Sequence, residues 1–246
     1  MSTVEKAFSI LERIGSSKSA ISLFDLAQQT SMPKPTVHRI LTTLIDLGYV
    51  AKHDRGYTIG INVLSLAKVA LQQTQTIREA AANHLVRVRD RFNESVNLAV
   101  WQQARAVLVA AEVSRHVLRI ENRVGQVFSL NNTSVGKAIA AYLPWHDVKK
   151  VIQRDGPAHT TEYSITDVDS LKRELDRIRE NRVAIDNEES VHGVRCVATP
   201  ILTHEGGVLG AVSISGPVAR MTDAVIEEMK SVLADIGKEI SVAVDH

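Results

Sequence analysis

Apolar residues recur at helical spacing twice in succession near the start of the chain, and then alternate at strand spacing. Residues 23–29 predict a short helix capped by Ser22, and residues 34–47 predict a second helix that Gly48 ends. Residues 49–59 predict a β-hairpin. The second helix has one apolar face, which comprises Val37, Ile40, Leu41, Leu44 and Leu47. This order of elements is the layout of a winged helix-turn-helix.

The outward face of the second helix is polar and basic. In helix-turn-helix proteins this helix enters the DNA major groove with its N-terminal residues against the base edges. The candidate DNA contacts are therefore Lys34, Thr36, His38 and Arg39 on the helix, with Lys52 and Arg55 on the wing. The alternative is a small helical subdomain whose polar face is merely solvated. One such module would bind DNA weakly, so the DNA-binding interpretation implies a dimer.

The rest of the chain mixes helices and strands. A helix over residues 4–14 completes a three-helix core, and residues 61–91 predict one or two connecting helices with a polar joint at 72–76. Strands are predicted at 96–101, 106–112, 117–121, 184–187, 194–201 and 208–215, and helices from about 134 and at 146–153, 168–182 and 223–244. This mixture predicts an α+β sensory domain.

Length and composition limit the possibilities further. The 246 residues have room for two domains, which we expect at 1–60 and 76–246 with a linker helix at 61–75. Because the net charge is only +1, any contact with nucleic acid depends on a local patch. The single cysteine fits a reducing cytoplasm, and neither a signal peptide nor a membrane-spanning run is expected. No Cys or His cluster has metal-ligand spacing, so no metal or other cofactor is expected.

Polar side chains interrupt the apolar strands of the second domain. Asp186 ends one strand, Cys196 lies within the next, and Ser213 and Ser215 share one face of a third. Together with Ser134 at the start of a helix, whose amides suit a carboxylate, they would fit a small polar ligand. Each residue also has an ordinary structural explanation, as a core thiol, a strand end or the start of an acidic turn.

Signatures of catalysis are weak. His116 and His192 are candidate general bases, but the sequence has no nucleophile elbow, phosphate-binding loop or dinucleotide fingerprint. Arg195 and Cys196 are neighbours on a strand and face opposite ways, which argues against an activated thiolate. We therefore do not expect an enzyme. The alternative hypothesis is a small-molecule enzyme or a thiol sensor centred on Cys196.

Short motifs along nearly the whole chain resemble the IclR family of bacterial transcriptional regulators. They are PKPTVHR at 33–39 with LGYV at 47–50, GYTIG at 56–60, SVGKA at 134–138 with YLP at 142–144, DNEE at 186–189, GVRCVATPI at 193–201 and GAVSISG at 210–216. The resemblance implies a winged helix that binds double-stranded operator DNA, a linker helix that dimerises it, and a GAF-like domain that binds a small effector, often a carboxylate-bearing metabolite. It also implies homodimers or homotetramers.

The resemblance also assigns effector contacts by position. They would be Asp186, Cys196, Ser213 and Ser215, with Ser134, Val135 and Ile120 around them. The sequence departs from the family pattern at two places. Pro35 replaces the more usual Ser or Thr, which removes a hydroxyl that could contact phosphate. Ser134 and Val135 replace smaller residues such as Gly or Ala, which changes the shape of the pocket.

Overall fold

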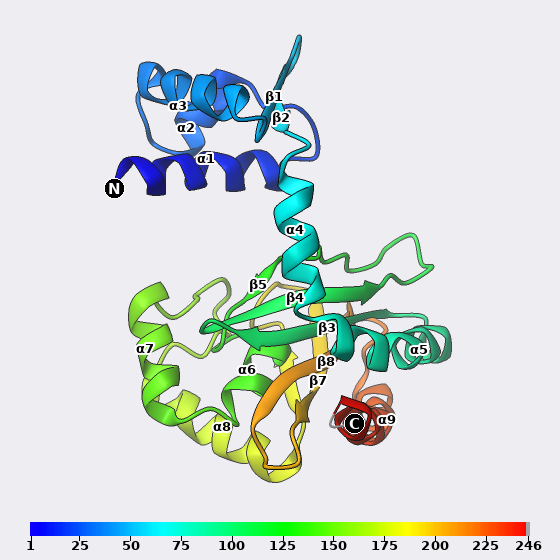
Figure 1. Cartoon of the computed structure of the whole chain (residues 1–246). Helices are drawn as coiled ribbons and strands as arrows, with labels where there is room; N and C mark the ends of the chain where they lie inside the picture. Colours follow the sequence, from blue (N-terminus) through cyan, green and yellow to red (C-terminus); the bar gives the residue numbers. More distant parts are fainter. Residues whose placement is uncertain (245–246) are drawn as a thin grey trace. The chain divides into compact units, whose positions relative to one another are not determined.

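The computed structural model describes residues 1–244, which form an N-terminal unit of residues 1–73 and a C-terminal unit that begins at Thr74. The N-terminal unit contains α1 (Thr3–Ser16), α2 (Leu23–Gln29), α3 (Lys34–Asp46), β1 (Val50–His53), β2 (Gly56–Ile59) and α4 (Val63–Gln72) (Figure 1). The two strands pair as an antiparallel hairpin. The winged helix-turn-helix predicted from the sequence is confirmed.

Local signals in the sequence set the ends of these helices. The hydroxyl of Ser22 accepts a hydrogen bond from the amide of Asp25 at 3.1 Å, as expected of an N-cap. Gly48 follows α3 with a φ of +74°, the left-handed conformation that glycine adopts readily. The helices and hairpin enclose one core, which includes Ile10, Ile14, Leu26, Val37, Ile40, Leu41, Leu44, Val50 and Tyr57.

Leu47 does not belong to this core, contrary to the prediction. It is 56% exposed, because α3 ends at Asp46 and Leu47 is the capping residue beyond the last regular turn. Helix α4 differs from the others in having no buried residue, although Leu64, Leu66 and Val69 are apolar. These three apolar side chains are exposed in the single chain.

The C-terminal unit is built on a six-stranded antiparallel sheet in the order β5-β4-β3-β8-β7-β6. The strands are β3 (Ser95–Gln102), β4 (Arg105–Glu112), β5 (Val127–Phe128), β6 (Ala184–Asn187), β7 (Val194–Leu202) and β8 (Val208–Pro217). The helices are α5 (Gln75–Phe92), α6 (Ser134–Ala140), α7 (Trp145–Asp155), α8 (Val168–Asn181) and α9 (Asp223–Val244). The α+β fold class predicted from the sequence is confirmed.

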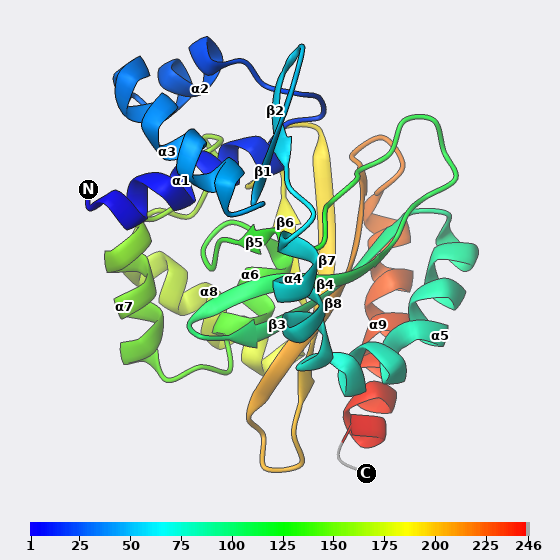
Figure 2. The same cartoon turned by 45° about the horizontal axis from the view of Figure 1, so that its top comes forward.

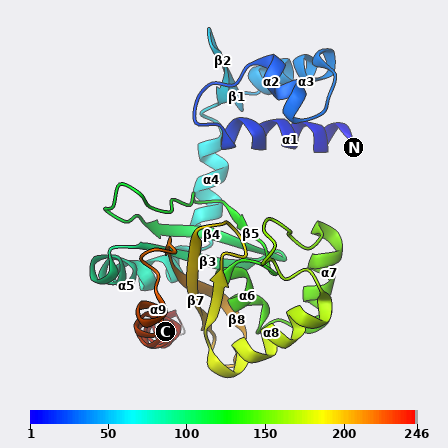
Figure 3. The same ribbon diagram turned by 180° about the vertical axis from the view of Figure 1, so that it is seen from behind.

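Helices cover both faces of this sheet. Figure 2 shows α5 and α9 on one side and α6, α7 and α8 on the other, and Figure 3 shows the same layers from behind. One core lies under each set of helices. Because side chains alternate between the faces, Ala184, Ala198 and Ala211 identify the face of β6, β7 and β8 that packs toward α6. That face carries the candidate site.

One predicted strand is wrong. Residues 117–121 lie in a long loop between β4 and β5, and the short strand β5 forms instead after that loop. Val117 is 99% exposed and Leu118 is 70% exposed, so their apolar character does not reflect burial in a sheet. Over the described residues, no helix combines the length and the apolar character that crossing a membrane requires.

Candidate functional site

The N-terminal part of α3 presents a polar surface. Lys34, His38 and Arg39 are exposed and Thr36 is partly exposed, while the apolar side of α3 is buried. The ammonium of Lys34 lies 4.6 Å from the centre of the Phe24 ring on α2, a cation–π contact that restrains it. The predicted base-reading residues therefore all lie outside the buried apolar face of α3.

The wing is held to the body of the N-terminal unit by its second strand. Ile21 and Tyr57 exchange two backbone hydrogen bonds of 2.9 and 3.0 Å. Lys52 and Arg55 are both exposed, the first on β1 and the second in the turn. Gly56 closes that turn with a φ of +134°, and a Cβ there would lie 2.3 Å from the carbonyl oxygen of Ile21. The close approach explains why glycine occupies this position.

The C-terminal unit contains a cavity of about 520 Å³ on the α6 side of the sheet. All seven residues assigned by position to effector contact line it, namely Ile120, Ser134, Val135, Asp186, Cys196, Ser213 and Ser215. They come from four strands or helices and from the loop before β5. The structure therefore brings together residues that are up to 95 positions apart in the sequence, between Ile120 and Ser215.

Strand register explains the floor of the cavity. Asp186 pairs with Cys196 across β6 and β7, and Cys196 pairs with Ser215 across β7 and β8. Next to this row, Ser213 pairs with Asn97 of β3. The Asn97 amide donates hydrogen bonds to the hydroxyls of Ser215 at 3.3 Å and Ser213 at 3.5 Å. Asn97 is buried and was missed by the sequence reasoning, although it too interrupts an apolar strand.

Asp186 organises the turn that follows it, as well as facing the cavity. Its carboxylate accepts hydrogen bonds from the amides of Glu189 at 2.8 Å and Ser190 at 3.2 Å, and from the hydroxyl of Ser190 at 2.5 Å. Burial raises the pKa of Asp186, and these hydrogen bonds oppose that rise. We call residues 186–190 the acidic turn. Asp186 therefore both lines the cavity and begins the acidic turn, so the functional and the structural explanation both apply to it.

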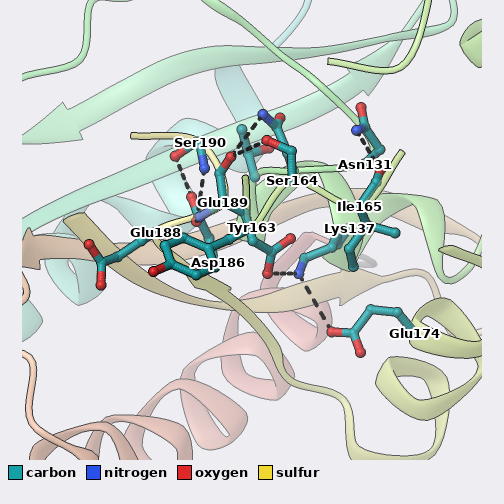
Figure 4. A network of polar contacts seen from close by, with 12 residues as sticks. Asn131, Lys137, Tyr163, Ser164, Ile165, Glu174, Asp186, Glu188, Glu189 and Ser190 are labelled. Atoms are coloured by element: carbon teal, nitrogen blue, oxygen red, sulfur yellow. Dashed lines mark hydrogen bonds and ion pairs between the residues drawn. The ribbon is translucent and has the colours of Figure 1, made fainter. Parts of the chain in front are cut away.

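A buried ion pair lies behind the acidic turn and was also missed. The ammonium of Lys137 on α6 is 2.5 Å from Glu189 and 3.5 Å from Glu174 on α8, and Lys137 is fully buried (Figure 4). Burial raises the pKa of Glu189, and the charge of Lys137 opposes the rise. A lysine inside the apolar segment 134–140 is the signal that could have identified it.

Helix α6 begins at Ser134, as predicted, but Thr133 is its N-cap. The Thr133 hydroxyl accepts a hydrogen bond from the amide of Gly136 at 3.0 Å. Ser134 and Val135 are buried in the first turn and line the cavity. The larger side chains noted in the sequence therefore occupy part of the wall.

The candidate general bases make other contacts: His116 lies 3.1 Å from the side-chain amide of Asn93, and His192 lies 3.1 Å from Glu162. Burial raises the pKa of the Cys196 thiol, and the charge of Asp186 adds to the rise, which disfavours the nucleophilic thiolate. Arg195 donates instead to the carbonyl of Met221 and pairs with Asp223. Among the described residues, no group of His, Cys, Asp and Glu side chains is arranged to hold a metal ion.

Each of the two units matches a known domain family. Residues 3–54 match the model of the IclR helix-turn-helix domain, and residues 69–242 match that of the bacterial transcriptional regulator IclR C-terminal domain. The HTH-type transcriptional regulator KdgR of Escherichia coli (strain K12) is 31% identical over 244 residues, which cover 98% of this chain and 92% of the relative. The Transcriptional repressor IclR of the same organism is 28% identical and covers 98% of this chain and 89% of the relative.

Solved structures share the fold. The crystal structure of the Thermotoga maritima IclR matches with a TM-score of 0.75 and 30% identity, and covers 99% of both chains. An IclR homolog from Microbacterium hydrocarbonoxydans, complexed with 4-hydroxybenzoate, has a TM-score of 0.75 at 19% identity, with 99% of each chain covered. The two Escherichia coli relatives are named as a transcriptional regulator and a repressor, which supports a regulator and not an enzyme. The chain belongs to the IclR family of bacterial transcriptional regulators.

Proposed function

We propose that this regulator binds its operator DNA as a homodimer or homotetramer, and that a small organic acid in the cavity of the C-terminal unit changes that binding. The observation that carries the proposal is the cavity itself, because it gathers hydroxyls, side-chain amides and the carboxylates of Glu121 and Asp186 on one concave surface. Because the proposed target is operator DNA, the proposed site of action is the cytoplasm.

The DNA contacts divide into two kinds. Lys34, Thr36, His38 and Arg39 on α3 would read base edges in the major groove. Lys52 and Arg55 on the wing would neutralise phosphates, which gives affinity without sequence preference. The exposed apolar residues of α4, in the proposed linker helix at 61–75, would pack against the same helix of a second copy. Domains at 1–60 and 76–246 would then carry DNA binding and effector binding.

The lining of the cavity supports an acid that also bears hydroxyl groups. Arg119, which pairs with Glu121 at 3.4 Å, provides a guanidinium that suits a carboxylate. Ser213 and Ser215 provide hydroxyls on the floor. Asp186 suits a donor group on the ligand. The 4-hydroxybenzoate bound by the Microbacterium homolog carries both a carboxylate and a hydroxyl. We therefore propose a carboxylate-bearing metabolite as the effector.

The proposed mechanism is thermodynamic linkage. An effector that binds one arrangement of the dimer more tightly shifts the population toward that arrangement, and so changes the spacing of the two α3 helices relative to the operator half-sites. By reciprocity, operator DNA changes the affinity for the effector by the same factor. The same linkage serves a repressor or an activator.

Replacing Arg39 by alanine is expected to lower operator affinity by about 1–3 kcal/mol, because a guanidinium that reads a base edge contributes that much discrimination. The measurement is a competition titration of labelled operator against nonspecific DNA at fixed salt. Arg91→Ala removes the same group from an exposed position on α5 and is the matched control. An Arg39→Ala protein with wild-type operator affinity would reject the base-reading role.

A further inference from the structure

The wall that Asp186 and Ser190 present to the cavity is held in place by residues that do not line it. Neither Glu189 nor Lys137 lines the cavity. Glu189 nevertheless lies within the acidic turn, next to Ser190, and its side chain is directed toward Lys137 (Figure 4). The position of the wall therefore depends on where Glu189 is held.

The backbone of Glu189 makes several of the hydrogen bonds that hold this wall. Its amide donates to Asp186 at 2.8 Å. Its carbonyl oxygen accepts from the hydroxyls of Ser164 at 2.6 Å and Thr161 at 3.1 Å, and from the Asn132 amide at 3.3 Å. The acidic turn, the loop around residues 158–164 and the turn just before α6 are thus joined at one residue. A displacement of Glu189 would move all three.

The charge balance shows what keeps Glu189 turned inward. Its carboxylate is nearly buried, and its Oε2 atom has no hydrogen-bond partner within the described chain. A buried carboxylate is costly unless an opposite charge is close. Lys137 supplies that charge at 2.5 Å, whereas Glu174 also pairs with Arg177 at 2.7 Å and depends less on Lys137.

We propose that Lys137 is a positioning residue for the effector cavity: from behind the wall, its ammonium holds Glu189 and thereby fixes the acidic turn that presents Asp186 and Ser190. The inference rests on the proposed function for its purpose, because it concerns the site proposed to hold the effector. The ion pair between Lys137 and Glu189 is present without any ligand. The position of the acidic turn can therefore be measured on the protein alone.

The single cysteine offers a direct readout of the turn. Cys196 pairs in register with Asp186 and is buried, and burial together with the nearby carboxylates raises its pKa. Opening the acidic turn at Glu189 and Ser190 would expose the thiol to water, and that exposure favours the thiolate that reacts. Alkylation by iodoacetamide, followed by mass spectrometry over a range of pH, therefore reports on the turn without an effector.

Lys137→Met is expected to speed alkylation of Cys196 by about tenfold or more at neutral pH, and to move the rate profile toward lower pH. If Lys137 supplied charge but did not hold the turn, its loss would leave the thiol as slow as before or slower, because the carboxylates would remain unbalanced. The pH profile therefore separates positioning from a general electrostatic effect.

Two further variants make the test decisive. Lys137→Met combined with Glu189→Gln removes both charges, so it leaves no unpaired buried ion if the single variant fails to fold. It also removes the ion pair that holds the acidic turn, so alkylation of Cys196 is expected to remain fast. Lys172→Met deletes a lysine from an exposed pair with Asp176 on α8 and should behave as wild type.

Wild-type alkylation rates in the folded double variant would overturn the proposal, as would equal acceleration in Lys172→Met. Circular dichroism of each variant establishes that the fold persists during labelling. The outcome is independent of whether any acid alters DNA binding. Failure of the proposed effector function would therefore show in the operator assay, and failure of the positioning role would show in the alkylation rates.

Discussion

Gly136→Ala is expected to lower the free energy of unfolding of the C-terminal unit by about 2–4 kcal/mol. A Cβ on Gly136 would lie 1.8 Å from the carbonyl oxygen of Ser129 and 2.7 Å from its carbonyl carbon. Backbone atoms cannot yield as a flexible side chain does, so α6 must move away from the segment before it. Urea denaturation followed by circular dichroism measures the loss.

Gly207→Ala is the matched control in the same unit. A Cβ there meets no atom closer than the Thr203 hydroxyl at 3.3 Å, so only a small adjustment is needed. We expect its free energy of unfolding to stay within about 0.5 kcal/mol of wild type. If Gly136→Ala were as stable as this control, the close packing of α6 against Ser129 would be incorrect.

Asp186→Ala is expected to abolish the response to the effector while unliganded DNA binding persists. The substitution removes a cavity group and leaves the amides of Glu189 and Ser190 without their acceptor, at a cost of about 1–3 kcal/mol for each unsatisfied group. The acidic turn should therefore lose its shape. The measurement is the change in operator affinity on adding the acid that acts on the wild type.

Ser213→Ala separates lost shape from lost contact. It deletes one hydroxyl from the floor and leaves the acidic turn intact, and Asn97 keeps its partner Ser215. We expect a response that requires more effector and reaches the wild-type limit, since one hydrogen bond contributes about 0.5–1.5 kcal/mol. A normal response in both variants would remove the cavity from the proposed mechanism.

Periodicity predicted most of the fold because the elements bury one face. The strand expected at 184–187 and the helix expected at 223–244 match β6 and α9, and alternation placed Ser213 and Ser215 on one face. The strand predicted at 117–121 is wrong because this segment does not bury one face. Val117 and Leu118 are apolar but exposed, so their pattern carries no information about pairing. β5, with two residues, is too short to show alternation.

The candidate site was predictable only in part. Polar interruptions of apolar strands and the start of α6 indicated five residues of the lining, and the family resemblance added Val135 and Ile120. The supporting residues Lys137 and Asn97 were not predicted, because their contacts are with partners that are distant in the sequence. The apolar segment 134–140 indicates that Lys137 is unusual, but its partner Glu189 is 52 residues away and only the fold brings the two together. Asn97 likewise acquires its partners only through the pairing of β3 with β8. Local patterns do not encode such contacts.

In the proposed function, one chain couples operator recognition to the binding of a small acid. The most direct test titrates the purified protein onto its own upstream intergenic DNA, in competition with nonspecific DNA at fixed salt, with and without a panel of organic and sugar acids that includes 4-hydroxybenzoate. We predict a sequence-specific complex whose affinity one acid changes by about 5–150-fold, the usual range of allosteric coupling. Specific binding that no acid alters would contradict the effector proposal, and no preference for any operator in a genome-wide site search would contradict the proposed DNA-binding function.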